Sequence, residues 1–321
     1  MNPDLQQIER LLFQRYGNTV DIDKLPAVFI VAAPRTGSTL LYQYLINRYN
    51  VWYVTNLVND QFPTMPALGV ALEQSLGAGR DAVAYESSYG KTEGVFAPSE
   101  GSHIFRNWFG GKHPAQTCSS RTLPGMNEHL TLTLKCIHGL TGRALLTKNA
   151  WNCFRIQELS RLLPNSHFLW MRRDIRTSAV SDLEARYRRG GTQVWNSATT
   201  ANYEEIQKRP YWEQVVEQQY EYNVAVGKDL HSFRPERHIE VWYEDLCANP
   251  DAVSSELDTY FTDAKLGIVA RPNVIPRFAM SPGPKGLCED RERIVGYVAA
   301  EHHRLSEYIY SHHSLISGSE R

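Results

Sequence analysis

The chain alternates short apolar runs with longer stretches in which apolar residues recur every three or four positions. The first run, residues 27–33, has the length and composition of a strand that is buried on both faces. A polar turn follows, and a helical pattern then continues to residue 49. Further strands are predicted at residues 144–147, 167–172 and 238–242. This alternation predicts an α/β fold, a mainly parallel central sheet flanked by helices, with a ligand at the carboxyl ends of the strands.

The segments around these strands complete the expected organisation, in which residues 1–321 form a single domain. Residues 55–143 interrupt the strand–helix rhythm with glycine, serine, proline and aromatic residues, which predicts a helical and loop insertion that has a poor core and binds the acceptor. Helices are also expected within 1–25 and near 152–163. A second insertion, at 190–235, is expected to end in a helix at 211–230. A C-terminal loop and helix are expected in 271–321, with the helix at 291–309 and a frayed end from 314.

The first strand, turn and helix together predict a binding site for an anion. Backbone N–H groups at the start of a helix have no partner within it, and the helix dipole adds positive potential at the same place. The turn lacks the Gly-Lys-Ser/Thr ending of a Walker loop, and its cation is Arg35. Lys148, Arg173 and Tyr243 each follow one of the other predicted strands. Strand ends of a parallel sheet share one edge, so these four side chains are expected on one rim.

The turn and its flanks, PRTGSTLL, resemble the 5′-phosphosulfate loop of sulfotransferases, enzymes whose donor is 3′-phosphoadenosine 5′-phosphosulfate (PAPS). The resemblance implies a nucleotide-binding fold like that of the P-loop proteins. It also implies that the donor is bound by the loop residues Arg35, Thr36, Gly37, Ser38 and Thr39.

Three further segments match the same family in chain order. In HFLWMRRDIRTSAVSDL, Arg173 and Ser181 have the spacing of the arginine and serine that hold the 3′-phosphate of the donor, and a forked guanidinium suits phosphate oxygens. Lys148 resembles the lysine that contacts the transferring sulfuryl region, although Ala150 stands where a proline is usual. Tyr243, in the sequence YEDL, resembles the tyrosine that lies against the donor adenine.

The resemblance covers residues 26–261 and implies an enzyme that moves a sulfuryl group from PAPS to a hydroxyl acceptor, such as a carbohydrate, a lipid or a small molecule. The hydroxyl attacks sulfur in line, and Arg35 and Lys148 stabilise the negative charge that develops. Lys285 is a further cation expected beside the nucleotide. No metal ion is required, because a sulfuryl group carries less charge than a phosphoryl group. Two alternatives stay open: a P-loop nucleotide or small-molecule kinase, and a non-catalytic adenosine-bisphosphate-binding module.

The acceptor hydroxyl must lose a proton, so a general base is expected within hydrogen-bond reach of it, supplied by the 55–143 insertion. Glu100 resembles the glutamate of a Pro-x-Glu segment in bacterial carbohydrate-type members. His103 is the alternative, because cytosolic sulfotransferases use a histidine base. Glu86 and Glu93 are further candidates, whereas Asn56 occupies the position where the tyrosylprotein branch has its glutamate.

Composition and charge narrow the class of function. The 321 residues are 42% hydrophobic and 21% charged, which is ordinary for a globular protein with a large core. With 34 basic and 35 acidic residues the net charge is −1, so no overall basic field favours a nucleic-acid partner. The basic cluster Arg186, Arg188 and Arg189 is interpreted as a solvated helix end. Four aromatic residues are candidates either for stacking on a sugar or for packing in the core: Trp52, Tyr53, Trp108 and Trp195.

The cysteines and the N-terminal sequence indicate the cellular compartment in which the protein is expected. The five cysteines include no Cys-x-x-Cys pair, so neither a metal-ligand pattern nor a disulfide framework is predicted. The N-terminus lacks the basic and apolar regions of a signal peptide, and no apolar run approaches the length of about eighteen residues that spans a membrane. A cytoplasmic protein without a transmembrane segment is expected, and its oligomeric state is left open.

Overall fold

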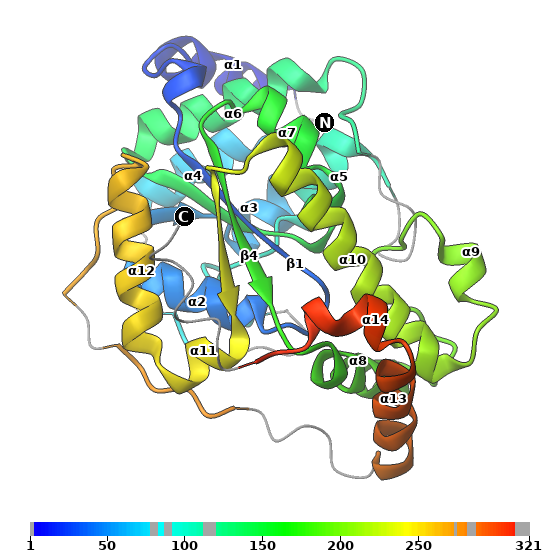
Figure 1. Ribbon diagram of the computed structural model, residues 1–321. Helices are drawn as coiled ribbons and strands as arrows, with labels where there is room; N and C mark the ends of the chain where they lie inside the picture. The colour runs from blue at the N-terminus through cyan, green and yellow to red at the C-terminus, as the bar shows by residue number, and fades with distance from the viewer. Residues whose placement is uncertain are drawn as a thin grey trace.

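A computed structural model describes residues 3–77, 83–86, 92–111, 120–272, 275–280 and 287–311. Within these residues five parallel strands form one sheet in the order β2-β3-β1-β4-β5 (Figure 1). The strands are β1 (Ala27–Ala32), β2 (Val51–Tyr53), β3 (Ala144–Lys148), β4 (Ser166–Arg172) and β5 (His238–Trp242). The four predicted strands are confirmed, with ends that differ by no more than one residue. The short edge strand β2 was not predicted, because three residues are too few to show a period.

The central strand β1 determines how the core is divided. All of its residues are buried, and it pairs on both edges, so that Phe29 lies opposite Thr147 of β3 and Phe168 of β4. Successive side chains of a strand point to opposite faces of the sheet. Phe29 therefore joins an apolar cluster on one face, and Ile30 joins a second cluster on the other. This burial on both faces is what the unbroken apolar run predicts.

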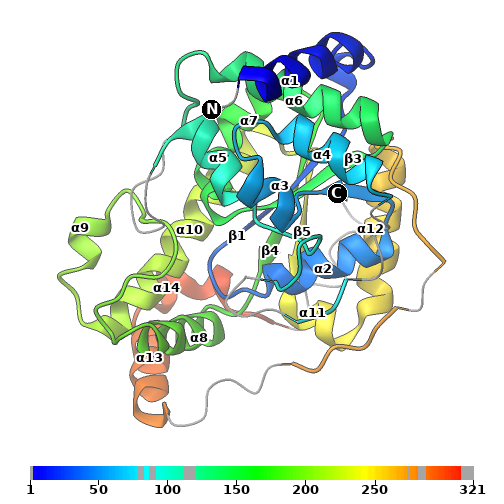
Figure 2. The ribbon, with the colours of Figure 1, turned by 180° about the vertical axis from the view of Figure 1, so that it is seen from behind.

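Helices cover both faces of the sheet (Figures 1 and 2). The face of Ile30 is covered by α2 (Ser38–Arg48), α11 (Tyr243–Ala248) and α12 (Pro250–Asp263). The face of Phe29 is covered by α5 (Ser102–Phe109), α6 (Met126–Thr141), η2 (Ala150–Phe154), α7 (Ile156–Leu162) and α10 (Tyr211–Phe233). A third apolar cluster joins α10 to α8 (Ile175–Arg188) and α13 (Cys288–Ala300). The remaining elements are α1 (Pro3–Tyr16), η1 (Ile22–Lys24), α3 (Asn56–Gln61), α4 (Pro66–Ser75), α9 (Tyr203–Ile206), α14 (His302–Leu305) and η3 (Ser306–Tyr308).

The 55–143 insertion does not have the poor core that its composition predicts. Helix α5 buries Ile104, Phe105 and Trp108, and α6 adds Leu130 to the same cluster, which also contains the Phe29 side of β1. The apolar residues of α5 recur within only eight residues between glycines, which is too short a stretch for a helical period to stand out. The insertion therefore shares the core of the sheet, and the interpretation of 1–321 as one domain stays a prediction.

Two predicted helices differ from the structure in their bounds. The segment near 152–163 is a 3₁₀ turn followed by α7, because the Asn149 side chain accepts a hydrogen bond from the Trp151 N–H at 2.9 Å and starts the turn early. The C-terminal helix begins at Cys288 and breaks at Glu301 into α13, α14 and η3. The end that is predicted to fray, from 314, lies outside the described residues.

Arg186 is not the solvated helix end that the sequence suggests. Its side chain is fully buried, and its guanidinium donates to Gln214 at 2.9 Å and to Gln218 at 3.0 Å, both on α10. Asp182, one turn earlier on α8, is also buried and lies 3.5 Å from Nε of Arg186. A buried charge needs such partners, and here a neighbouring helix supplies them. The other two basic residues of the cluster are exposed, as predicted.

Four of the five cysteines lie in the described residues, and all four are free thiols. Cys136, Cys153 and Cys247 are buried, whereas Cys288 is exposed; Cys118 lies outside the described residues. Burial raises the pKa of the Cys136 thiol to about 12, which makes it unreactive at neutral pH. None of the helices in the described part of the chain is long and apolar enough to cross a membrane.

His167 makes the stability of the fold depend on pH. It is only 4% exposed, and its Nδ1 lies 2.8 Å from the hydroxyl of Tyr260. Burial, followed by the nearby charges of Arg237 and Arg234, lowers the pKa of His167 to about 4. The pKa of this histidine is about 6.5 in the unfolded chain. At pH values between the two pKa values, the unfolded chain therefore binds more protons than the folded one. The contribution of neutral His167 to stability is therefore full above that range and is lost as the pH falls, by up to about 3 kcal/mol.

We expect His167→Gln to remove this part of the acid sensitivity. Between pH 7 and pH 4.5 the free energy of unfolding should fall by less in the variant than in the wild type, because glutamine does not titrate. Chemical denaturation of both proteins at the two pH values measures the difference. The amide can still hydrogen-bond the Tyr260 hydroxyl, so the variant keeps the contact while losing the proton. An equal fall in the two proteins would contradict the prediction.

Candidate functional site

The rim at the carboxyl ends of the strands carries a loop that is held in place by the surrounding fold. The loop begins where β1 ends and runs into α2. Within it, Oγ1 of Thr36 donates to the carbonyl of Ala33 at 2.9 Å. From α10, the amide of Gln219 donates to the carbonyl of Pro34 at 2.8 Å. The loop is therefore fixed both by its own side chains and by a helix from the far part of the chain.

Two residues of this loop have an unusual backbone conformation, and the loop ends at the N-cap of α2. Arg35 and Gly37 both have left-handed φ angles, 67° and 87°. For an arginine this region is unfavourable, and such strain is found mainly at functional sites. Gly37 is the N-cap of α2 and has no side chain to satisfy the first N–H groups, and a Cβ at this position would lie 2.4 Å from the ring of Tyr243. The start of α2 is therefore open to an anionic ligand.

Two motifs that are far apart in the sequence meet beside this loop. The Arg35 Nε donates to the hydroxyl of Ser181 at 3.3 Å, and Nη1 of Arg173 donates to the Arg35 carbonyl at 3.1 Å. Arg173 is further held by the hydroxyl of Thr177, 3.1 Å from its Nε. Burial lowers the pKa of Arg173, and the like charge of Arg35 is a smaller cause in the same direction. Arg35 and Arg173 thus place two positive charges beside the loop, which favours the binding of an anion there.

Tyr243 lies under the loop rather than at its surface. It is 5% exposed, the edge of its ring faces Gly37, and the guanidinium of Arg173 lies over the ring at 4.4 Å from the centroid. This is a cation–π contact, which orients Arg173. The structure thus gives Tyr243 a packing role, and its contact with an adenine stays a prediction.

On the other side of the loop, Lys148 and Glu100 form an ion pair. The ammonium group of Lys148, at the end of β3, donates to the carboxylate of Glu100 and also to Oγ1 of Thr39, at 3.2 Å. The next residue, Asn149, donates to the backbone carbonyl of Glu100 at 3.0 Å. Glu100 directly precedes Gly101, the N-cap of α5, so a rigid helix follows it. The structure therefore brings a carboxylate of the insertion into direct contact with the lysine of the rim.

The other candidate bases lie elsewhere. The imidazole of His103 is about half exposed, and its Nδ1 lies 3.4 Å from the Asp60 carboxylate at the end of α3. The backbone N–H of His103 donates to Asn59 of the same helix, at 2.9 Å. Glu86 and Glu93 are exposed. Glu100 is thus the carboxylate that joins the rim, while His103 is paired with α3.

Of the remaining predicted residues, Lys285 lies outside the described residues. Ser38 is buried at the first position of α2. The four aromatic candidates for sugar stacking, Trp52, Tyr53, Trp108 and Trp195, are all less than 9% exposed and belong to the packed interior. Of the residues that position the site, Gln219 was not anticipated, because nothing in the helical sequence around it indicates that its amide reaches the loop.

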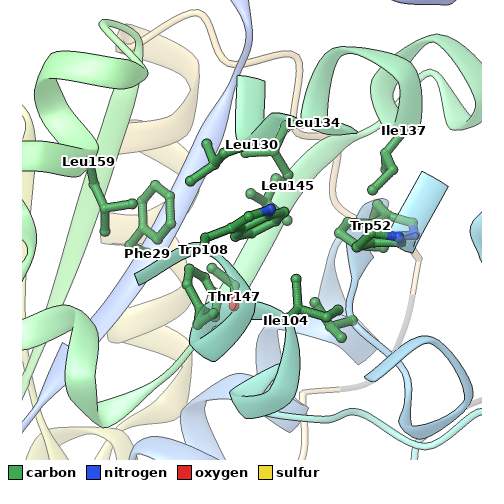
Figure 3. Close-up of a pocket in the computed structure, with 13 residues that line it drawn as sticks. Phe29, Trp52, Ile104, Trp108, Leu130, Leu134, Ile137, Leu145, Thr147 and Leu159 are labelled. Atoms are coloured by element: carbon green, nitrogen blue, oxygen red, sulfur yellow. The ribbon is translucent and has the colours of Figure 1, made fainter. Parts of the chain in front are cut away.

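A small cavity lies behind the Glu100 side of the site, between the sheet and helices α5 and α6 (Figure 3). It measures about 20 Å³, close to the space that one water molecule occupies. Thr147, Phe29 and Trp108 line it together with other apolar side chains. A cavity of this size belongs to the packing of the core and does not accommodate an acceptor.

The chain was compared with protein families, with solved structures and with curated sequences. A family model described as the sulfotransferase family matches residues 26–261. Among solved structures, the chain is similar to sulfotransferase STF9 from Mycobacterium avium, with 14% identity and a TM-score of 0.49 over 96% of this chain and 78% of that one. A sulfotransferase from Alicyclobacillus acidocaldarius is 16% identical, with a TM-score of 0.45 over 88% of this chain and 95% of that one. No curated protein sequence matches the chain.

Proposed function

This chain belongs to the sulfotransferase family, and we propose that it transfers a sulfuryl group from PAPS to the hydroxyl of an acceptor. The observation that carries the proposal is the arrangement at the rim. An open helix N-terminus and two arginines lie on one side of the loop, and a carboxylate–lysine pair lies on the other. The helix N-terminus and the two arginines suit a polyanionic nucleotide. The carboxylate can remove a proton, and the lysine beside it can stabilise a developing negative charge.

The residues at the rim fit the donor. PAPS, when bound, supplies the sulfuryl group, and adenosine 3′,5′-bisphosphate is what remains of it. The backbone N–H groups at the start of α2, with Arg35, would hold its 5′ end. Arg173 and Ser181 would hold its 3′-phosphate, a role that their hydrogen-bond contacts with Arg35 support. Tyr243 and Lys285 are proposed for the nucleotide from the sequence resemblance.

Glu100 is proposed as the general base. Its carboxylate can accept the proton of the acceptor hydroxyl, because an ionised carboxylate offers lone pairs on both oxygens. Lys148 holds that carboxylate in place and keeps its own positive charge for the oxygen on which negative charge develops. The side chain of Glu100 is 29% exposed, so an acceptor can approach it from solvent. The acceptor class, a carbohydrate, lipid or small molecule, is proposed only as a hydroxyl compound.

Titration calorimetry separates the three functions that fit a loop of this kind. Without Mg²⁺, adenosine 3′,5′-bisphosphate should bind, and ATP should not compete with it. Transfer of label from PAPS to a panel of hydroxyl compounds then tests for the enzyme. Preference for ATP with Mg²⁺ would indicate a kinase instead, and bisphosphate binding with no transfer to any hydroxyl compound would indicate a binding module.

We expect Arg173→Ala to weaken binding of adenosine 3′,5′-bisphosphate by about 2–3 kcal/mol, roughly 30- to 150-fold, because a charge-assisted pair with the 3′-phosphate is lost. Binding of adenosine 5′-phosphate, which lacks that group, should change little. The matched control is Arg188→Ala, an exposed arginine at the last position of α8, the helix that follows Arg173, and it should bind both ligands as the wild type does. Equal losses for the two nucleotides in Arg173→Ala would reject the assignment.

A further inference from the structure

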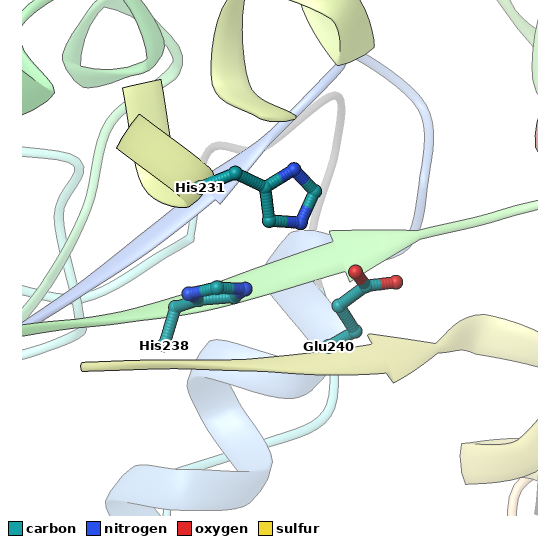
Figure 4. Close-up of side chains that lie close together, drawn as sticks. All are labelled: His231, His238 and Glu240. Atoms are coloured by element: carbon teal, nitrogen blue, oxygen red, sulfur yellow. The ribbon is translucent and has the colours of Figure 1, made fainter. Parts of the chain in front are cut away.

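Three side chains that can bind a metal ion meet at the edge of the sheet, away from the loop. His231 lies in the last turn of α10, and His238 and Glu240 lie two residues apart on β5, so that both point to the same face of the sheet. Their possible ligand atoms all lie within 4.8 Å of one another. Figure 4 shows the two imidazole rings and the carboxylate gathered on one side of the strand. The proposed sulfotransfer does not use any of them.

A hydrogen bond fixes which nitrogen of His238 can bind a metal. Its Nδ1 lies 2.8 Å from the backbone carbonyl of Arg234. A carbonyl oxygen can only accept, so in this contact Nδ1 carries the hydrogen. The neutral ring then has its lone pair on Nε2. A histidine ligand of a metal ion is typically oriented in this way, by a backbone carbonyl bonded to its other nitrogen.

The carboxylate of Glu240 is also oriented from outside the cluster. Its Oε2 accepts a hydrogen bond from Arg172 of the neighbouring strand β4, at 2.5 Å. The guanidinium of Arg172 is itself held between the rings of Trp170 and Trp242, 4.6 Å and 4.5 Å from their centroids. The carboxylate is therefore held in a defined orientation by a fixed cation, as the carboxylate ligands of metal sites are held by their own partners.

We propose that His231, His238 and Glu240 bind one divalent transition-metal ion, with zinc as the best match. Two imidazoles and one carboxylate form a zinc ligand set, with water in the fourth position. Bonds of 2.0–2.2 Å in a tetrahedral site set the ligand atoms about 3.4 Å apart, closer than the outer limit of the present cluster. His231 is exposed at the end of its helix and can make this adjustment by rotating its side chain.

Such an ion ties the end of α10 to an edge strand. Among the described residues β5 pairs with β4 alone, and most residues of β5 are only half-buried. The connection between His231 and His238 is short, so the ion cross-links a compact turn at the start of the strand whose other end leads into Tyr243. Because the ion binds the folded chain through three ligands that unfolding separates, its binding stabilises the fold.

Zinc titration of the chain without a histidine tag tests the site. By calorimetry we expect one Zn²⁺ per chain, and at about one hundred times the dissociation constant the midpoint of thermal unfolding should rise by about 5 °C. Cobalt, used as a spectroscopic probe, should give the strong visible absorption of a tetrahedral site. His238→Gln and His231→Gln should each weaken zinc binding at least tenfold and reduce the thermal shift to about half or less at the same zinc concentration. His303→Gln, an exposed histidine of α14, is the control and should behave as the wild type.

The proposal fails if the wild type binds no zinc under these conditions. It fails equally if both variants bind one zinc ion as tightly as His303→Gln does. His231 is exposed, so His231→Gln should unfold at the same temperature as the wild type in the presence of a chelator, which separates loss of metal from loss of fold. Binding of adenosine 3′,5′-bisphosphate should be the same in all four proteins, because none of these residues touches the loop.

Discussion

Glu100→Gln is expected to lower turnover about 10²- to 10⁴-fold while leaving the affinity for adenosine 3′,5′-bisphosphate within about twofold. Glutamine keeps the shape of the side chain and can still contact the ammonium group of Lys148, but it cannot accept a proton at neutral pH. The ion pair with Lys148 and the contact between Asn149 and the Glu100 backbone both hold this residue at the loop. Steady-state transfer of label from PAPS, with bisphosphate calorimetry beside it, measures the two effects separately.

His103→Gln is the matched control, since His103 lies three residues further along the chain, in the first turn of α5, and pairs with Asp60. Its turnover should stay within about tenfold of the wild type. If His103→Gln is inactive and Glu100→Gln is active, the histidine is the base and the site works as in the cytosolic branch. If both variants remain active, the base lies elsewhere, and Glu93 and Glu86 are the next residues to replace.

Lys148→Ala is expected to lower turnover about 10²- to 10³-fold with a smaller change in donor affinity. Two effects contribute: the cation beside the reacting oxygen is lost, and Glu100 loses the partner that holds it. Because the two residues are paired, the double variant with Glu100→Gln should lose less activity than the product of the two single losses. Arg35→Ala should behave like Lys148→Ala, since both cations lie at the loop.

The control for Lys148 is Lys228→Ala, an exposed lysine on α10, which should leave turnover unchanged. A large loss of bisphosphate affinity with normal turnover in Lys148→Ala would assign the lysine to donor binding in the ground state. Fully multiplicative losses in the double variant would show that Lys148 and Glu100 act independently.

The sequence by itself determined four of the five strands and the place of the loop between β1 and α2. Residues 27–33 could be read as a buried strand because burial on both faces requires an unbroken apolar run, a property that is visible locally. The strands that end at Lys148 and just before Arg173 are also buried throughout, whereas the strand before Tyr243 is an edge strand and mostly half-buried. Since the carboxyl ends of parallel strands share one edge, the positions of the strands also placed these side chains on one rim. An apolar run and the alternation of strands with helices are visible in short segments of the chain, so the sequence alone revealed them.

Only the tertiary structure decided which side chains touch. The contact of Arg35 with Ser181, and that of Lys148 with Glu100, join segments whose separation in the chain says nothing of their distance. The choice between Glu100 and His103 depended on what packs around the start of α5: Glu100 precedes the helix and meets Lys148, whereas His103 lies in its first turn and meets Asp60 of α3. Arg186 was misjudged for the same reason: a charge on a helix looks solvated until another helix packs over it. Which side chains form hydrogen bonds between helices and strands, and which are buried there, depends on how the whole chain packs. The pattern of residues within a short segment does not show this.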